Sequence, residues 1–301
     1  MRPGSVSPLA SALCVASTPG WSGIKHVFIF RDSYTTTGFN VSGIQPTPTN
    51  PLGNTTFPGW TAADGPNWVD QLTVKYNASK LLTYNLAYGG ATINSALVAP
   101  YLPTVSSVAE QIENEWFPAY ASKPSTAPWT YSDTLFAIFD GINDVENSWH
   151  KGLPATTTLN AEIFAVYHGL VMELYYAGAR NFAFLNNEAL LDVAACIKDE
   201  KPDVNVFTVD ANKYFTEVLD KPSSFKQTAQ YKNTTAYCVA YEKAGIAQSN
   251  NGTPTETYFD ASCGVPVNEY FWLNSLHPTY PMQDVLAQEV AAQLISGPNV
   301  C

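Results

Sequence analysis

Short apolar runs recur along the chain and alternate with segments of helical periodicity. The runs are rich in aliphatic, β-branched and aromatic residues, which is typical of strands buried on both faces of a parallel sheet. The predicted strands are Val27–Phe30, Leu81–Ala87, Thr134–Phe139, Asn181–Leu185 and Val204–Val209. We therefore expect an α/β protein with about five mostly parallel strands.

Apolar residues spaced by three or four positions predict helices between these strands. The predicted helices are Asn67–Tyr76, Ser106–Trp116, Leu159–Ala177 and Pro281–Ile295. Gly178 follows the third segment as a helix end commonly requires, and Pro281 suits the first turn of the last one. Helices between successive parallel strands predict a three-layer α/β/α sandwich.

The domain organisation follows from the irregular segments. The loop from Gly38 to Pro66 is rich in Pro, Gly, Thr and Asn, and a connection this long more often shapes a site than separates domains. Residues 1–18 carry one positive charge and a short apolar stretch, which resembles a truncated secretory signal peptide. We expect a signal peptide over 1–18 and a single domain over 19–301.

Composition narrows the possible partners. Apolar residues make up 46% of the chain, charged residues only 14%, and the formal net charge is −11. An excess of acid argues against binding to nucleic acid or to anionic membranes, which needs clustered Lys and Arg. No run of about 18 apolar residues would allow membrane insertion. We expect a soluble monomer that acts on a small molecule.

Sequons and cysteines favour a secreted, extracellular protein. Five Asn-x-Ser/Thr sequons, which are candidate glycosylation sites, begin at Asn40, Asn54, Asn77, Asn233 and Asn251. Removing Cys14 with the signal leaves four cysteines, which permit three disulfide pairings. The nearest pair, Cys238 with Cys263, is our first choice and leaves Cys196 with Cys301. No cysteine or histidine spacing resembles a zinc site, so we expect no metal.

Ligands of an open parallel sheet bind at the carboxyl ends of its strands. Four segments that carry polar or glycine residues fall there: Arg31–Ser33, Asn85–Ala91, Asp140–Asp144 and Trp272–Pro278. A serine directly after a buried strand suits a nucleophile, and it needs a base at neutral pH.

Only four histidines are present, which limits the choice of base. His26 opens a strand and His168 lies within a helix, so we expect both to be structural, and His150 is a more distant candidate. His277 therefore becomes the expected base. The oxyanion of an acyl-transfer intermediate needs fixed donors. The backbone of Ser33, the backbone of Gly90 and the side chain of Asn143 would supply them.

These four segments resemble the blocks of the GDSL-type, or SGNH, hydrolases. Ser33, Gly90, Asn143 and His277 match the Ser, Gly, Asn and His of that family, in the family's order and across nearly the whole chain. The segments Trp21–His26, Tyr34–Phe39, Gly65–Asp70 and Leu82–Ala91 further resemble the secreted fungal acetylesterases of carbohydrate esterase family sixteen. The resemblance implies a flavodoxin-like sheet and a serine esterase without a cofactor that removes acetyl groups from oligosaccharides.

The chain departs from the family pattern at Arg31, where glycine is usual. If the backbone there has a positive φ, arginine strains the turn and displaces Ser33. If the backbone is ordinary, arginine instead puts a cation beside the nucleophile.

A second departure is Asn274, where many members carry an aspartate that orients the histidine. An asparagine can accept a hydrogen bond from the ring but cannot stabilise the imidazolium by charge. Asp140 and Glu146 flank the Asn143 block, and we expect their negative charge to raise the pKa of His277.

Further residues are assigned supporting roles. We expect Asp32 to anchor the nucleophile turn and Asp144 to cap the helix that follows. Tyr34, Tyr88, Trp149 and Trp272 are candidate substrate-binding side chains, although aromatic residues more often lie in the core.

Three alternative functions stay open. One is a glycan-binding family member whose catalysis is impaired by Arg31. Another is a GDSL lipase or phospholipase, which would need an apolar lid. The third is a glycosidase that uses two carboxylates among Asp32, Asp140 and Asp144, and this one leaves the Gly90 and His277 blocks unexplained.

Overall fold

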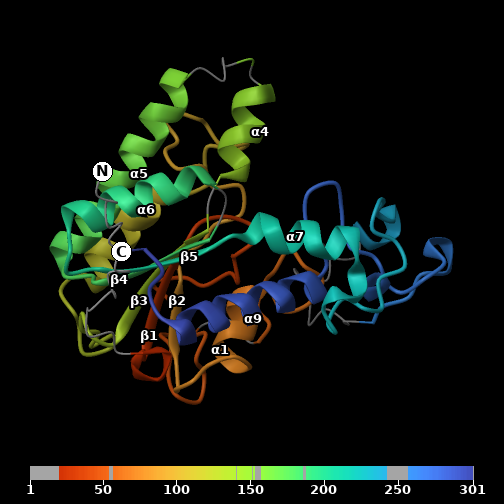
Figure 1. The fold of residues 1–301 in the computed structure, drawn as a ribbon, viewed down its shortest axis with the longest axis horizontal. Helices are drawn as coiled ribbons and strands as arrows, with labels where there is room; N and C mark the ends of the chain where they lie inside the picture. Colours follow the sequence, from red (N-terminus) through yellow and green to blue (C-terminus); the bar gives the residue numbers. More distant parts are fainter. Residues whose placement is uncertain are drawn as a thin grey trace, which may run out of the picture.

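A five-stranded sheet lies at the centre of the computed structural model, which describes residues 20–53, 57–139, 141–150, 152, 157–185, 188–242 and 257–300 (Figure 1). Its strands are β1 (His26–Phe30), β2 (Leu82–Asn85), β3 (Thr134–Phe139), β4 (Asn181–Leu185) and β5 (Asn205–Val209). They lie in the order β2-β1-β3-β4-β5, and every neighbouring pair is parallel. The predicted strands and their direction are confirmed, and β2 is shorter than expected at both ends.

Side chains alternate between the two faces of each strand and build two separate cores. In β1, Phe28 and Phe30 belong to one core, whereas Val27 and Ile29 belong to the other. Helices α5 (Thr157–Ala177) and α6 (Glu188–Glu200) cover the first core, and α1 (Trp68–Val74) and α9 (Tyr280–Ser296) cover the second (Figure 1). The three-layer α/β/α sandwich is therefore confirmed.

The predicted helices are present with small changes. The segment expected from Ser106 begins at Ser107, whose hydroxyl accepts the Glu110 backbone N–H in a capping box. It continues as α2 (Val108–Glu110), a π-helical stretch over Gln111–Trp116 and α3 (Phe117–Tyr120). Short 3₁₀ helices cover Trp21–Gly23, Pro222–Ser224, Ala261–Cys263 and Val267–Glu269.

Helices α6 and α7 (Ala211–Asp220) were not predicted, and α4 (Ile142–His150) was expected only as a helix without bounds that Asp144 would cap. The reason is clearest for α4, whose buried residues are the polar Asn143 and Asp144. A search for apolar periodicity cannot detect a helix whose inward face is polar.

The described part of the segment between α7 and α9 is largely irregular and is held by a disulfide. Cys238 and Cys263 are bonded, which confirms the predicted local pair. Cys263 packs in a small cluster with Tyr241, Tyr270 and Leu273, and the last of these lies four residues before His277. The disulfide therefore stabilises the segment that carries the candidate base.

The second predicted disulfide is wrong for Cys196, which is a free and exposed thiol on the outer side of α6. Cys301 lies outside the described residues, as does the predicted signal peptide over residues 1–18. Among the sequons, Asn40 and Asn77 are exposed and Asn233 is partly exposed, whereas Asn54 and Asn251 also fall outside the described residues. Glycosylation stays a prediction.

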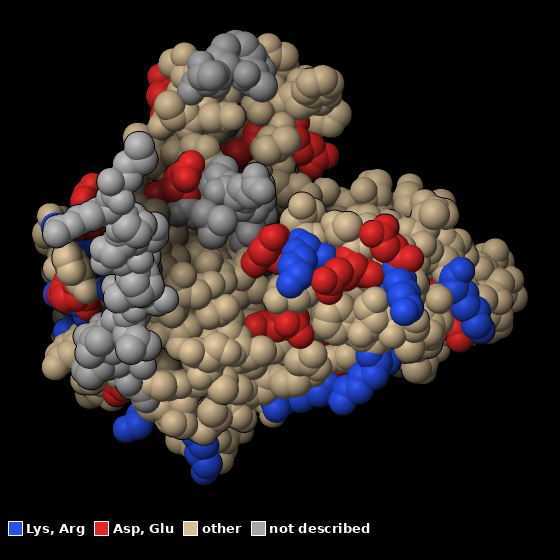
Figure 2. All heavy atoms as spheres, viewed as in Figure 1, with Lys and Arg blue, Asp and Glu red and all other residues tan. Residues whose placement is uncertain are grey.

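On the face shown in Figure 2, acidic and basic side chains are interspersed over the part formed by α7 and α9, and uncharged residues cover most of the rest. Across the described part of the chain, no helix combines the length and the apolar character that crossing a membrane requires.

Candidate active site

The strand order identifies where a ligand would bind. β1 and β3 are neighbours, but the chain leaves β1 towards β2 on one side and leaves β3 towards β4 on the other. A crevice opens at such a switch point, outside the carboxyl ends of the strands. Ser33 follows β1 and Asn143 follows β3, so both lie beside this crevice.

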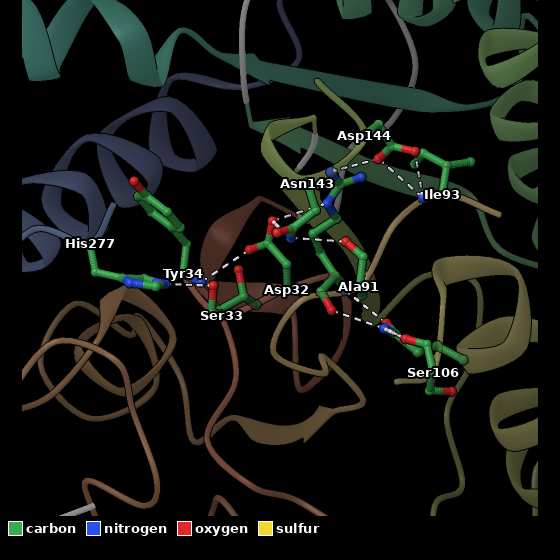
Figure 3. Close-up of polar contacts among 12 residues, drawn as sticks. Asp32, Ser33, Tyr34, Ala91, Ile93, Ser106, Asn143, Asp144 and His277 are labelled. Carbon is green, nitrogen blue, oxygen red and sulfur yellow. Dashed lines mark hydrogen bonds and ion pairs between the residues drawn. The ribbon is translucent and has the colours of Figure 1, made fainter. Parts of the chain in front are cut away.

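A short hydrogen bond joins the two predicted reacting groups. His277 Nε2 lies 2.7 Å from Ser33 Oγ, although 244 residues separate them in sequence (Figure 3). On the other side of the ring, Nδ1 lies 3.1 Å from Asn274 Oδ1, which also accepts the backbone N–H groups of Leu276 and His277. The carbonyl of Asn274 is therefore placed to orient the ring. A serine bonded to an oriented imidazole is the arrangement of an activated nucleophile.

The pKa of His277 moves in the opposite direction from our expectation. Burial lowers it to about 4, because a charged imidazolium loses hydration in the cleft. Glu146 lines the same cleft, whereas Asp140 lies outside the described residues. Desolvation outweighs the effect expected from these carboxylates, and the ring is neutral and able to accept a proton at neutral pH.

Asp32 anchors the turn that presents Ser33. Its side chain accepts the Tyr34 backbone N–H, and its backbone carbonyl accepts those of Thr35 and Thr36. The carboxyl group is buried, and desolvation raises its pKa although Arg31 opposes this. The predicted anchoring role agrees with this geometry.

Arg31 occupies a backbone conformation that favours glycine. Its φ is +137°, which answers the question left open by the sequence: the turn at this position does need a positive φ. The side chain does not enter the cleft. It is fully buried, with Nε 3.4 Å from an Asp32 oxygen and Nη2 3.3 Å from an Asp144 oxygen. Two buried carboxylates therefore neutralise and hold the arginine.

The side chain of Gln111 also holds this strained residue in place. Its Oε1 accepts the Arg31 backbone N–H at 2.8 Å, and its Nε2 donates to the Arg31 carbonyl at 2.9 Å. The side chain is fully buried and also donates to the carbonyl of Ser106 (Figure 3). Both peptide groups at the strained position are thereby satisfied, which keeps the nucleophile turn in one conformation.

We expected Asp144 to cap its helix, and it does not do so. It is the third residue of α4, and its carboxylate accepts the backbone N–H of Ile93 in addition to the bond from Arg31. Its neighbour Asn143 donates to Asp32 at 3.2 Å and to the carbonyl of Ala91 at 3.0 Å (Figure 3). The start of α4 is therefore tied to both the Ser33 turn and the loop that follows β2.

Gly90 is required at its position for two reasons. Its φ is +84°, and a Cβ atom there would lie 2.3 Å from the Tyr101 ring. Among the described residues, the backbone N–H groups of Ser33 and Gly90 have no hydrogen-bond acceptor. Two unengaged donors beside a nucleophile suit an oxyanion hole. The Asn143 amide, by contrast, already uses both of its hydrogens.

These groups lie in an open cleft of about 460 Å³. The side chains and backbone that line it come from Ser33, Trp60, Thr61, Ala62, Gly89, Gly90, Tyr101, Asn143, Glu146, Asn147, Leu273, Asn274, Leu276 and His277. The four predicted blocks thus converge on one site, and the loop over residues 38–66 contributes to it as expected.

Comparison with known proteins agrees with this geometry. No family model matches the sequence. An acetylesterase of Thermothelomyces thermophilus is 36% identical over 278 residues, which cover 89% of this chain and 87% of that protein. The chain belongs to the family of this acetylesterase. It is a carboxylic ester hydrolase.

Solved structures similar to the esterase are more distant. A catalytic mutant of an acetylxylan esterase from Geobacillus stearothermophilus has a TM-score of 0.44 and 14% identity, covering 90% of this chain and 94% of that one. An α/β hydrolase from the metagenome of Lake Arreo, Spain, has a TM-score of 0.43 with the same identity and coverage.

The esterase does not use the predicted aromatic residues to line its cleft. Tyr34 is buried and packs against the His277 ring, where its hydroxyl donates to the carbonyl of Leu276. Trp272 packs on Phe271 and donates to a backbone carbonyl. Tyr88 and Trp149 are exposed outside the described lining.

Sequence reasoning missed several residues of the site. Trp60 and Tyr101 line the cleft and are 38% and 66% exposed, and Gln111 holds Arg31 from a helix. Trp60 lies in the loop that we expected to shape the site, so its place in the sequence could have identified it as a lining residue. Gln111 gave no usable signal, because Ser107, Asn114 and Glu115, at helical spacing from it, are polar as well. Nothing in the local sequence pointed to Tyr101.

We predict that replacing Arg31 destabilises the esterase. Arg31→Met keeps the strained backbone and removes the charge, so about 3–5 kcal/mol of stability is lost. Arg31→Gly also loses the charge but relieves strain worth about 1–3 kcal/mol, so its stability lies between those of Arg31→Met and the natural chain. Denaturant unfolding of the three proteins measures this order.

The same variants have a defined pH dependence. Without the guanidinium, the pKa values of Asp32 and Asp144 in the folded protein rise further above those of the unfolded chain. The folded state then binds more protons than the unfolded state, so the loss of stability grows as pH rises above about 4. Hydrolysis of an acetate ester by Arg31→Gly is expected to fall. A faster Arg31→Gly enzyme would show instead that arginine damages the site.

We predict that the acid limb of kcat/KM lies near pH 4, since His277 must be unprotonated to accept the serine proton. Asn274→Asp places a negative charge beside Nδ1 and is expected to move this limb upward by about 1–2 pH units. Asn274→Ala is the control, because it removes the acceptor without adding charge and lowers activity at every pH. An unmoved limb in Asn274→Asp would contradict the role of His277.

Proposed function

We propose that this protein is a secreted serine acetylesterase that removes acetyl groups from oligosaccharides. The observation that carries the proposal is the 2.7 Å contact between Ser33 Oγ and His277 Nε2 at the floor of the cleft. The acetylesterase relative supports acetate as the acyl group. The disulfide of Cys238 with Cys263 and the exposed sequons support an extracellular location.

The reaction follows from the groups that face one another. His277 takes the proton of Ser33 as the serine oxygen attacks the acetyl carbonyl carbon, which forms a tetrahedral oxyanion. The imidazolium then returns the proton to the sugar oxygen as its bond to the acyl carbon breaks. Water, deprotonated by the same ring, attacks the acetyl-serine and releases acetate and the free serine.

The oxyanion would be held by the backbone N–H groups of Ser33 and Gly90. Both donors are unengaged within the described structure, so they need no rearrangement before the substrate binds. Asn143 would join them if its amide turns from Asp32, 3.2 Å away, towards the substrate oxygen. The first two donors therefore carry the larger share in this proposal.

The lining of the cleft supports an ester of a small acyl group with a sugar hydroxyl as the substrate. Trp60 and Tyr101 offer partly exposed aromatic faces at the lining, and such faces pack against the apolar faces of sugars. Glu146 and Asn147 also line the cleft, and their polar groups suit hydroxyls better than lipid chains. These features favour an oligosaccharide over a long acyl chain as the bound part.

The burial of Arg31 bears on the alternative of an impaired, glycan-binding protein. That alternative requires the arginine to displace Ser33 or to occupy the cleft. Its side chain instead points away into buried carboxylates, and Ser33 keeps its bond to His277. We therefore favour an active enzyme.

We predict that Ser33→Ala lowers kcat for hydrolysis of p-nitrophenyl acetate by a factor on the order of a million, as loss of a serine nucleophile does elsewhere. Ser275→Ala, which changes an exposed serine of the His277 loop, is the matched control and keeps full activity. Release of p-nitrophenol measures both. Undiminished turnover by Ser33→Ala would refute the proposed nucleophile.

We predict that Trp60→Ala raises KM for acetylated xylo-oligosaccharides by roughly tenfold, since loss of an aromatic packing partner costs about 1 kcal/mol or more. Its kcat/KM for p-nitrophenyl acetate changes little, because that small ester makes no sugar contact. Tyr131→Ala is the control, since Tyr131 is 63% exposed outside the cleft lining. Equal effects on both esters would argue against an oligosaccharide substrate but not against the esterase activity.

A further inference from the structure

A second cluster of reactive side chains lies apart from the cleft, between α5 and α6. His168 comes from α5, and Cys196 and Glu200 lie one turn apart on α6. The two helices run over the same side of the sheet (Figure 1). None of these three residues contributes to the lining of the cleft.

Two distances within the cluster match those between ligands of one metal ion. His168 Nε2 lies 3.3 Å from Glu200 Oε1, and Cys196 Sγ lies 3.5 Å from the same oxygen. All three ligand atoms lie within 4.8 Å of one another. Tetrahedral zinc, with bonds of about 2.0 Å to nitrogen and oxygen and about 2.3 Å to sulfur, separates N from O by about 3.3 Å and S from O by about 3.5 Å.

Protein contacts alone leave part of this cluster unsatisfied. His168 Nε2 is shielded from solvent and, within the described structure, makes no contact with hydrogen-bond geometry, although it points at a carboxylate. Cys196 is a free thiol and therefore available as a ligand. A cation placed among the three atoms would satisfy the imidazole nitrogen and the carboxylate together.

The donor set selects the type of cation. A thiolate and an imidazole suit zinc and disfavour calcium or magnesium, which prefer oxygen ligands. One thiolate and one carboxylate together balance the charge of a divalent ion. On binding, the ion replaces the thiol proton, which passes to solvent, and water fills the fourth position.

We propose that His168, Cys196 and Glu200 form a zinc site that cross-links α5 to α6. No short sequence motif indicates this site, because its ligands come from two helices. His168 and Cys196 are 28 positions apart in the sequence. The site lies away from Ser33, so the ion stabilises the outer layer of the sandwich and takes no part in ester hydrolysis.

Titration of the full, chelator-treated chain with Co²⁺ tests the proposal, because a cobalt–thiolate bond gives a near-ultraviolet charge-transfer absorption. We expect this band to saturate at one ion per chain and to disappear when Zn²⁺ is added. Cys196→Ser is expected to abolish the band, and His168→Gln to weaken binding at least tenfold. Asp199→Asn, on the same helix, and His150→Gln are matched controls that leave binding unchanged.

Thermal unfolding gives a second readout that does not depend on cobalt. Zn²⁺ is expected to raise Tm of the natural chain and of both controls, with no rise for Cys196→Ser. Acetate-ester turnover is expected to be the same with and without zinc. Absence of the band, a band that His168→Gln leaves intact, or a thiol titration that finds Cys196 already oxidised would overturn the proposal.

Discussion

The buried ion pairs of Arg31 with Asp32 and Asp144 are the constraint on which this site depends. A lone charge in this interior would be very costly, and an arginine at positive φ adds backbone strain. Two carboxylates and the bidentate contact of Gln111 hold the residue nevertheless. Because these partners come from the turn after β1, from α4 and from the stretch after α2, the residue that strains the turn also joins three segments of the site.

This arrangement separates the charged support of the site from its reacting groups. The guanidinium and its carboxylates are buried and do not line the cleft, whereas a neutral imidazole does. Burial keeps the pKa of His277 near 4, so the ring is a base without a charged partner. Asn274 then needs only to orient the ring, and its uncharged carbonyl suffices for that.

Much of the fold was predictable because buried parallel strands are continuous apolar runs, and the five runs in this chain are all strands. Ser33, Gly90, Asn143 and His277 were predictable because each follows a strand or precedes the last helix. The bounds of helix α4 were not predicted because its inward residues are polar, and Gln111 was missed because its partner is a backbone group 80 residues away. The pKa of His277 was misjudged because desolvation depends on packing that no local pattern reveals.

By itself, the sequence determined the class of fold, the order of the strands along the chain and four residues that meet at the cleft, Ser33, Gly90, Asn143 and His277. These follow from local rules of periodicity, capping and strand ends. Only the tertiary structure decided how Arg31 is tolerated, since that depends on two carboxylates brought to it from elsewhere in the chain. It also decided which aromatic residues face the cleft and which thiol stays free, because direction and distance between distant segments are properties of packing.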